Sequence, residues 1–145
     1  MIMAMASDHA GYNLKEELKK HLMEKYPSFE IMDLGTDSEE SVDYPIYGEA
    51  CGKAVAGGKA DLGIVCCGTG IGISMAANKV KGVRCGLCTN VEAAHMTKQH
   101  NNANIIALGG RTTDVETAKA IVDEWLGTEF EGGKHKRRTD MLDNM

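Results

Sequence analysis

Short apolar runs alternate with helical patterns five times along this chain of 145 residues. The first apolar run spans residues 1–6, and in the segment 13–25 that follows, Leu14, Leu18 and Leu22 recur every four residues on one helix face. Seventeen glycines against two prolines favour tight turns between strands and helices. The alternation predicts a three-layer α/β fold: a five-stranded parallel sheet with helices on both faces, Rossmann-like, in the flavodoxin-like strand order.

The remaining elements continue this pattern into one domain over residues 1–145, with a charged C-terminal arm from about Glu129. Ligands of such sheets bind beyond the carboxyl ends of the strands, so the residues that follow each strand are the candidate site. Further strands are expected at 29–34, 62–66, 83–88 and 105–108, and further helices at 44–56, 73–79, 91–99 and 114–126.

Composition argues against several classes of function. The net charge of −5 disfavours broad nucleic-acid binding, which needs many Lys and Arg side chains on phosphates. The apolar run 1–6 is too short for a membrane span and lacks the basic flank of a signal peptide. Five cysteines are an odd number, and Cys66 adjoins Cys67, so a secreted disulfide framework is not expected. We therefore expect a cytoplasmic protein that binds neither nucleic acid nor membrane.

The segment 67–72, Cys-Gly-Thr-Gly-Ile-Gly, joins a predicted buried strand to a helix. Its three glycines let backbone N–H groups converge on an anion, with support from the helix dipole. It lacks the Lys-Ser/Thr of a Walker A loop, and its glycine spacing differs from the dinucleotide fingerprint. The alternative is that the glycines serve only the tight turn.

Side chains with catalytic chemistry lie around this segment. Cys67 stands where the helix begins, a position that stabilises a thiolate, so it is a candidate base or nucleophile, or else a small buried residue. Cys66 should face the other side of the sheet and be inert. Asp8 and His9 follow the first strand and His100 ends the fourth helix, and we expect all three near the same sheet edge as Cys67. Either histidine could instead be a structural residue.

Two further clusters have both a structural and a functional interpretation. The basic run 134–138 is either solvated surface or a phosphate site, in which Lys134 and Arg138, one helical turn apart, act with Arg111. Cys85 and Cys88 have the spacing of half a zinc or redox site. They lie in a predicted buried strand without a second pair, so core packing is expected.

Five sequence motifs extend over nearly the whole chain. They are Ser-Asp-His-Ala-Gly-Tyr at 7–12, Asp-Tyr-Pro at 43–45, Cys-Gly-Thr-Gly-Ile-Gly-Ile-Ser-Met-Ala-Ala-Asn-Lys at 67–79, Gln-His-Asn at 99–101 and Glu-Gly-Gly-Lys-His at 131–135. In this order they resemble the signatures of the B-type ribose-5-phosphate isomerases. That family also includes galactose-6-phosphate and allose-6-phosphate isomerases.

The resemblance implies an aldose–ketose isomerase of the pentose phosphate pathway that interconverts ribose 5-phosphate and ribulose 5-phosphate through an enediolate, without metal or cofactor. Cys67 matches the family's base, which takes the proton from C2 and returns it to C1. Thr69 matches the residue that helps proton transfer between the two oxygens. His100 matches the residue that opens the furanose ring, and Asp8 would assist at the ring oxygen or hydroxyls.

The resemblance also implies how the substrate is bound. The enediolate oxygen would be held by Asn101 and by the backbone N–H groups of Gly68, Gly70, Ile71 and Gly72, so the glycine segment serves the enediolate rather than the phosphate. The phosphate would be bound by His9, Arg111, Lys134 and Arg138. Lys134 departs from the arginine common in the family, and an ammonium does not reproduce the bidentate guanidinium fork.

Family members are dimers or larger oligomers whose active sites combine two subunits. The resemblance therefore implies a homo-oligomer, dimer or tetramer, in which Tyr44, His100, Asn101 and Arg111 are candidates to act across an interface. Three other functions stay open at this point. They are isomerisation of a six-carbon sugar phosphate, a flavodoxin-like nucleotide-binding module in which Cys67 is dispensable, and a thiol redox protein that uses Cys85 and Cys88.

Overall fold

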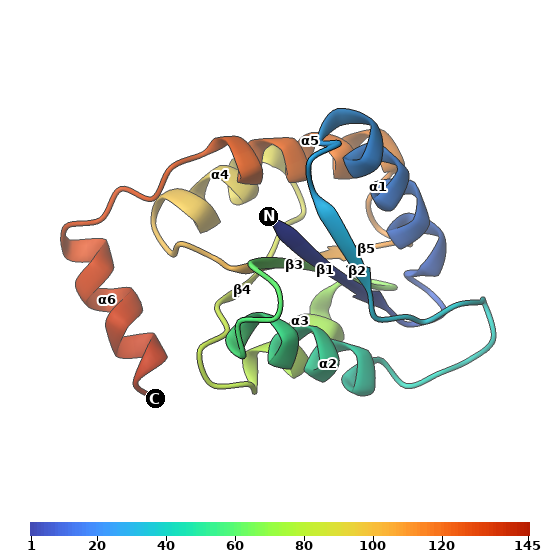
Figure 1. The fold of residues 1–145 in the computed structure, drawn as a ribbon, viewed down its shortest axis with the longest axis horizontal. Helices are drawn as coiled ribbons and strands as arrows, with labels where there is room; N and C mark the ends of the chain where they lie inside the picture. The colour runs from blue at the N-terminus through green and yellow to red at the C-terminus, as the bar shows by residue number, and fades with distance from the viewer.

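Five parallel strands form the central sheet of the computed structural model, which describes residues 1–145 (Figure 1). All four strand pairings are parallel, and the order is β2-β1-β3-β5-β4. The predicted five-stranded parallel sheet is confirmed. The strands are β1 (Ile2–Ser7), β2 (Glu30–Asp33), β3 (Leu62–Cys67), β4 (Cys85–Leu87) and β5 (Ile105–Gly109).

The strand order differs from the expected flavodoxin-like one at its last two strands. β5, not β4, pairs with β3, and β4 forms the edge of the sheet. Every residue of β5 is buried, which suits a central strand covered on both faces. β4 has only three residues, none of them buried, and a short, poorly covered strand belongs at an edge.

Helices cover both faces of the sheet, as predicted. α1 (Tyr12–Lys25), α4 (Val91–Gln99) and α5 (Val115–Gly127) lie on one face, and α2 (Tyr44–Ala56) and α3 (Ile71–Asn78) on the other (Figure 1). Each face has its own core cluster. The first includes the buried leucine stripe of α1 and Trp125, and the second includes Ile73 and Val65.

The charged arm contains a sixth helix, α6 (Lys134–Asp143), which no apolar pattern in the sequence indicated. In Figure 1 it stands apart from the three layers, and no other helix or strand packs extensively against it. Its link to the domain is polar: Arg84, just before β4, forms an ion pair with Asp143 at 2.7 Å. None of the six helices is both long and apolar enough to cross a membrane.

Candidate active site

The carboxyl ends of β1 and β3 lie side by side, with Ser7 paired to Cys66. The segment after β1 leads to α1 on one face of the sheet, and the segment after β3 leads to α3 on the other face. These two segments of the chain therefore diverge, and a crevice opens between them. We call this end of the sheet the carboxyl edge and the opposite end the amino edge. The crevice brings together the segments that follow β1 and β3, which are 8–11 and 68–71.

Cys67 is the last residue of β3 and is only 5% exposed. Its side chain belongs to the core cluster under α2 and α3, whereas Cys66 belongs to the opposite cluster under α1, as the strand alternation predicted. The backbone N–H of Gly70 donates to the Cys67 Sγ atom at 3.2 Å. This donor, one residue before α3 begins, stabilises negative charge on the sulfur.

Two neighbouring residues and internal hydrogen bonds fix the segment 67–72, which we call the glycine turn. The Arg111 N–H donates to the Gly68 carbonyl at 2.9 Å, which ties the turn to the end of β5. A Cβ atom on Gly72 would lie 2.7 Å from the Tyr44 ring, so this ring covers the turn. Thr69 is exposed, and its Oγ1 atom accepts the Ile71 N–H at 3.2 Å. The Gly70 and Ile71 amides thus bond within the turn in this structure.

Asp8 and His9 directly follow β1, in one of the two segments that border the crevice. Asp8 is buried, and its Oδ1 atom accepts the Gly11 N–H at 3.0 Å. The Nδ1 atom of His9 accepts the Val42 N–H at 3.1 Å. Because Nδ1 acts as the acceptor, the proton of the neutral ring is on Nε2, which remains a donor for an anion.

Arg111 lies beside the same turn. A Cβ atom on Gly68 would be 3.5 Å from both Cδ and Nη1 of Arg111. Within one chain, the carboxyl edge therefore combines Asp8, His9, Tyr44, the glycine turn and Arg111.

His100 and Asn101 lie at the amino edge, so the expectation that His100 shares an edge with Cys67 was wrong for a single chain. α4 follows the carboxyl end of β4 and runs back along the sheet, and His100 therefore lies where the next strand begins. The Asn104 carbonyl accepts the Gly63 N–H near the start of β3. A strand of six residues such as β3 separates the two edges by about 17 Å.

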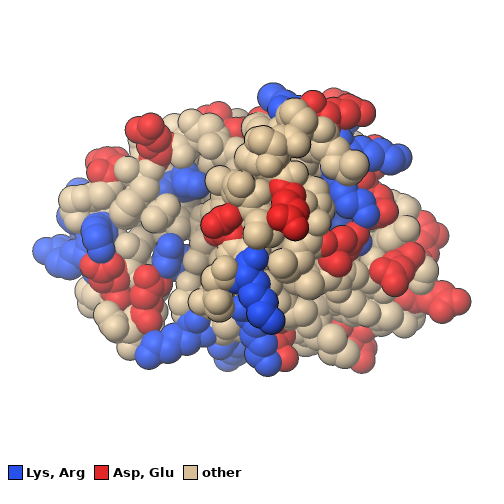
Figure 2. Space-filling view, viewed as in Figure 1, with Lys and Arg blue, Asp and Glu red and all other residues tan.

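His100 belongs to a second cluster at this amino edge. Its ring is stacked on that of His135, with 4.3 Å between centroids and an interplanar angle of 9°. Glu131 lies 3.9 Å from the Nε2 atom of each ring. Lys134 and Arg138 are exposed on α6 and form no ion pair, whereas Lys136 pairs with Asp140 at 2.9 Å. Figure 2 shows basic side chains over this arm on a surface of mixed charge.

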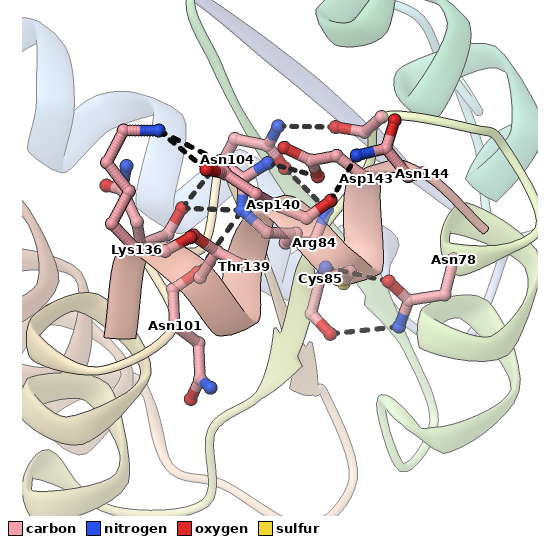
Figure 3. Close-up of polar contacts among 12 residues, drawn as sticks. Asn78, Arg84, Cys85, Asn101, Asn104, Lys136, Thr139, Asp140, Asp143 and Asn144 are labelled. Atoms are coloured by element: carbon pink, nitrogen blue, oxygen red, sulfur yellow. Dashed lines mark hydrogen bonds and ion pairs between the residues drawn. The ribbon is translucent and has the colours of Figure 1, made fainter. Parts of the chain in front are cut away.

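Arg84 ties this cluster to the sheet, a role that was not predicted from the sequence. The Nη1 atom bonds Asp143, and the Nη2 atom donates to the Asn102 carbonyl at 3.0 Å (Figure 3). The Nε atom donates to the Asn101 carbonyl at 3.2 Å. A lone arginine before a strand carries no sequence signal for such a role, because both carbonyls belong to a distant loop, with Asn101 17 residues further on.

The His100, Glu131 and His135 donor atoms lie within 4.8 Å of one another, close enough to suggest a metal site. The stacking disfavours that interpretation, because imidazole lone pairs lie in the ring plane and two nearly parallel planes do not meet at one ion. Cys85 and Cys88 pack against opposite faces of the sheet, so they do not form a zinc or disulfide pair. Burial raises the pKa of the Cys88 thiol to about 12 and also raises that of Cys85.

Comparison with known proteins places the chain in a family. It matches the ribose/galactose isomerase family model over residues 3–142. It is 46% identical over 139 residues to ribose-5-phosphate isomerase B of Escherichia coli, covering 96% of this chain and 92% of that protein. The chain belongs to the ribose/galactose isomerase family.

Solved structures agree with this assignment. Ribose-5-phosphate isomerase B of Clostridium thermocellum is 49% identical, with a TM-score of 0.95 over 99% of this chain and 96% of that one. The enzyme of Mycoplasma genitalium, solved with bound ribulose-5-phosphate, is 39% identical, with a TM-score of 0.92 over 99% and 94% of the two chains.

Proposed function

We propose that this protein interconverts ribose 5-phosphate and ribulose 5-phosphate in the cytoplasm, with Cys67 as the base. The observation that carries the proposal is the position of the Cys67 sulfur. It is buried at the end of β3, beside the crevice between β1 and β3, and it accepts a hydrogen bond from the Gly70 amide. The relatives that are ribose-5-phosphate isomerases support the choice of sugar. Five free thiols suit a reducing compartment.

The proton transfer follows from the geometry of the glycine turn. The Cys67 thiolate removes the proton from C2 of the open-chain aldose, and the electrons of that C–H bond form the enediolate. Thr69 moves a proton between the O1 and O2 oxygens, and the Cys67 thiol returns its proton to C1 to give the ketose. The backbone N–H groups of Gly68 and Gly72, which unlike those of Gly70 and Ile71 form no bond within the turn, stabilise the enediolate oxygen together with Asn101. Each such donor is typically worth about 3 kcal/mol.

Ring opening requires residues from both edges of the sheet. His100 and Asp8 would act on the furanose ring, but in one chain they lie at opposite edges of the sheet, which a six-residue strand separates by about 17 Å. We therefore propose a homodimer in which the partner's His100 and Asn101 complete the site around Cys67. Exposed apolar side chains near the turn, Ile46, Ile71 and Met75, suit such an interface.

The phosphate would be bound by groups from both copies. His9 and Arg111 come from the Cys67 chain, and Lys134 and Arg138 from the partner. α6 suits this role because it stands off its own domain, with a cavity of about 430 Å³ between it and the segment 78–86. Leu142 of α6 and Met145, which follows the helix, are also exposed in the single chain.

The experiment measures ribulose 5-phosphate formation from ribose 5-phosphate in EDTA, with allose 6-phosphate and galactose 6-phosphate run beside it. We expect turnover to survive chelation, to be fastest with ribose 5-phosphate and to fall by at least about 10²-fold in Cys67→Ala. Cys66→Ala, a neighbouring buried cysteine on the other face, is the matched control and should keep its activity. Full activity in Cys67→Ala would refute the mechanism, and a faster six-carbon substrate would refute the choice of sugar.

A further inference from the structure

A second imidazole lies directly against His100 and has no part in the mechanism above. The His135 side chain is 12% exposed, whereas that of His100 is 38% exposed, so His135 forms the inner layer of the stack. We propose that His135, together with Glu131, is a positioning residue that holds His100 in place for ring opening. This inference rests on the proposed function and concerns its first step.

The stack is fixed from two elements. His100 directly follows α4, and its N–H donates to the Met96 carbonyl at 2.9 Å. His135 lies in the first turn of α6. Two nearly parallel rings at this separation restrict each other's rotation, because any large turn of one ring would collide with the other. The buried ring therefore selects the orientation of the exposed one.

Glu131 adds a charge of fixed position. Its N–H donates to the Gln99 carbonyl at 2.9 Å, so the residue is tied to the end of α4. Each of its carboxylate oxygens faces the Nε2 atom of one ring at 3.9 Å. A fixed negative charge attracts the N–H edge of a nearby ring, so this carboxylate favours ring orientations that turn Nε2 toward it. The outer ring, His100, is the one that solvent or substrate can reach.

Ring opening requires a proton donor held in one orientation at the ring oxygen. The protonated His100 donates to the ring oxygen O4 as the C1–O4 bond breaks. The Asp8 carboxylate accepts the O1 hydroxyl proton as the C1=O1 bond forms, which balances the step. Misplacing such a group by about 1 Å can cost about 10²-fold in rate, so a residue that only orients His100 still controls this step.

The test separates ring opening from proton transfer. Ribose 5-phosphate must open its ring before Cys67 acts, whereas ribulose 5-phosphate has no ring, because its 5-hydroxyl carries the phosphate. We would measure kcat/KM for ribose 5-phosphate and deuterium exchange at C1 of ribulose 5-phosphate in D₂O. The variants are His135→Ala, His135→Phe, which keeps a flat ring, and Glu131→Gln. The matched control is His95→Ala, on α4 and bonded to Glu124 instead.

We expect His135→Ala to lower kcat/KM for ribose 5-phosphate by about ten- to a hundredfold while deuterium exchange stays within about twofold of wild type. His135→Phe should recover most of the loss, Glu131→Gln should show the same selective defect, and His95→Ala should match wild type. Equal losses in both reactions, or no loss in either, would overturn the positioning role. If the wild-type protein itself shows neither turnover nor exchange, the proposed function fails, and the inference fails with it.

Discussion

Gly70 has the strongest backbone constraint in the glycine turn. Its φ angle of +79° lies in the left-handed region, and a Cβ atom there would lie 2.7 Å from the Leu87 side chain and 2.9 Å from the Leu108 backbone carbon. Only glycine meets both conditions without distortion. The same residue supplies the N–H that reaches the Cys67 sulfur, so the constraint on the backbone and the chemistry of the site are linked.

Replacing Gly70 by alanine should therefore lower both stability and activity. Gly58→Ala is the matched control, because Gly58 has the same φ of +79° but no atom within 4 Å of the place where a Cβ atom would lie. We expect Gly58→Ala to cost about 1 kcal/mol from the backbone angle alone, and Gly70→Ala about 3 kcal/mol because the collision is added. Urea unfolding monitored by circular dichroism measures both, and equal losses would contradict the packing argument.

At the level of single residues, the sequence predicted side-chain orientation correctly within a strand, where neighbouring side chains point to opposite faces. The opposite facings of Cys66 and Cys67 follow from the pleat of one strand, and the structure confirms them. The prediction for His100 was wrong because this residue follows a helix rather than a strand. A strand ends at the carboxyl edge, whereas the helix after it returns to the amino edge. The Glu131 and His135 pair was visible as a motif but carried no assigned role, since its meaning depends on contact with His100.

At the scale of elements, α1 and β2 are joined by buried charge. Lys15 is 1% exposed, and its Nζ atom contacts Asp33 at 2.7 Å, as does that of Lys19. Burial alone would raise the pKa of Asp33, but hydrogen bonds from Lys15, Lys19 and the Gly35 N–H together hold its pKa below the usual 3.8. A lowered carboxyl pKa contributes stability above about pH 4 and loses it as the pH falls further.

Asp33→Asn should therefore destabilise the fold in a pH-dependent way. We expect a loss of about 2 kcal/mol at pH 7, since Lys15 is left buried with only Glu16 at 3.5 Å. The difference from wild type should shrink as the pH falls from about 4, where Asp33 of the unfolded chain becomes protonated, toward the lower pKa of Asp33 in the folded chain. Urea titrations from about pH 3 to pH 7 measure it, and a difference that does not change with pH would show that the ion pair is not its cause.

Elements with a clear apolar stripe were predicted well, and those without one were not. The leucines of α1 and the apolar run of β5 are buried as expected. α6 has charged side chains at most positions and only one buried residue, Thr139, so no hydrophobic pattern indicated a helix. β4 is shorter than the predicted strand 83–88. It lies at the edge because β5, whose residues are all buried, takes the central position next to β3.

At the scale of the whole molecule, the proposed function assigns each chain two half-sites, on opposite edges of its sheet. Asp8, Cys67 and Arg111 lie at the carboxyl edge. The stacked rings of His100 and His135 lie at the amino edge with Lys134. A second copy can bring the two edges together, and a symmetric dimer would then form two complete sites. The five-stranded architecture was predictable from the sequence, but the separation of the half-sites depends on the direction in which α4 returns.

The most direct measurement is complementation between Cys67→Ala and His100→Ala chains. Co-expressed with two different affinity tags, they can be purified as a heterodimer in which one site combines an intact Cys67 with an intact His100 and the other has neither. We predict that each parent homodimer is nearly inactive on ribose 5-phosphate and that the heterodimer has about half of wild-type activity, since one site of two is whole. A heterodimer no more active than its parents would contradict the shared site.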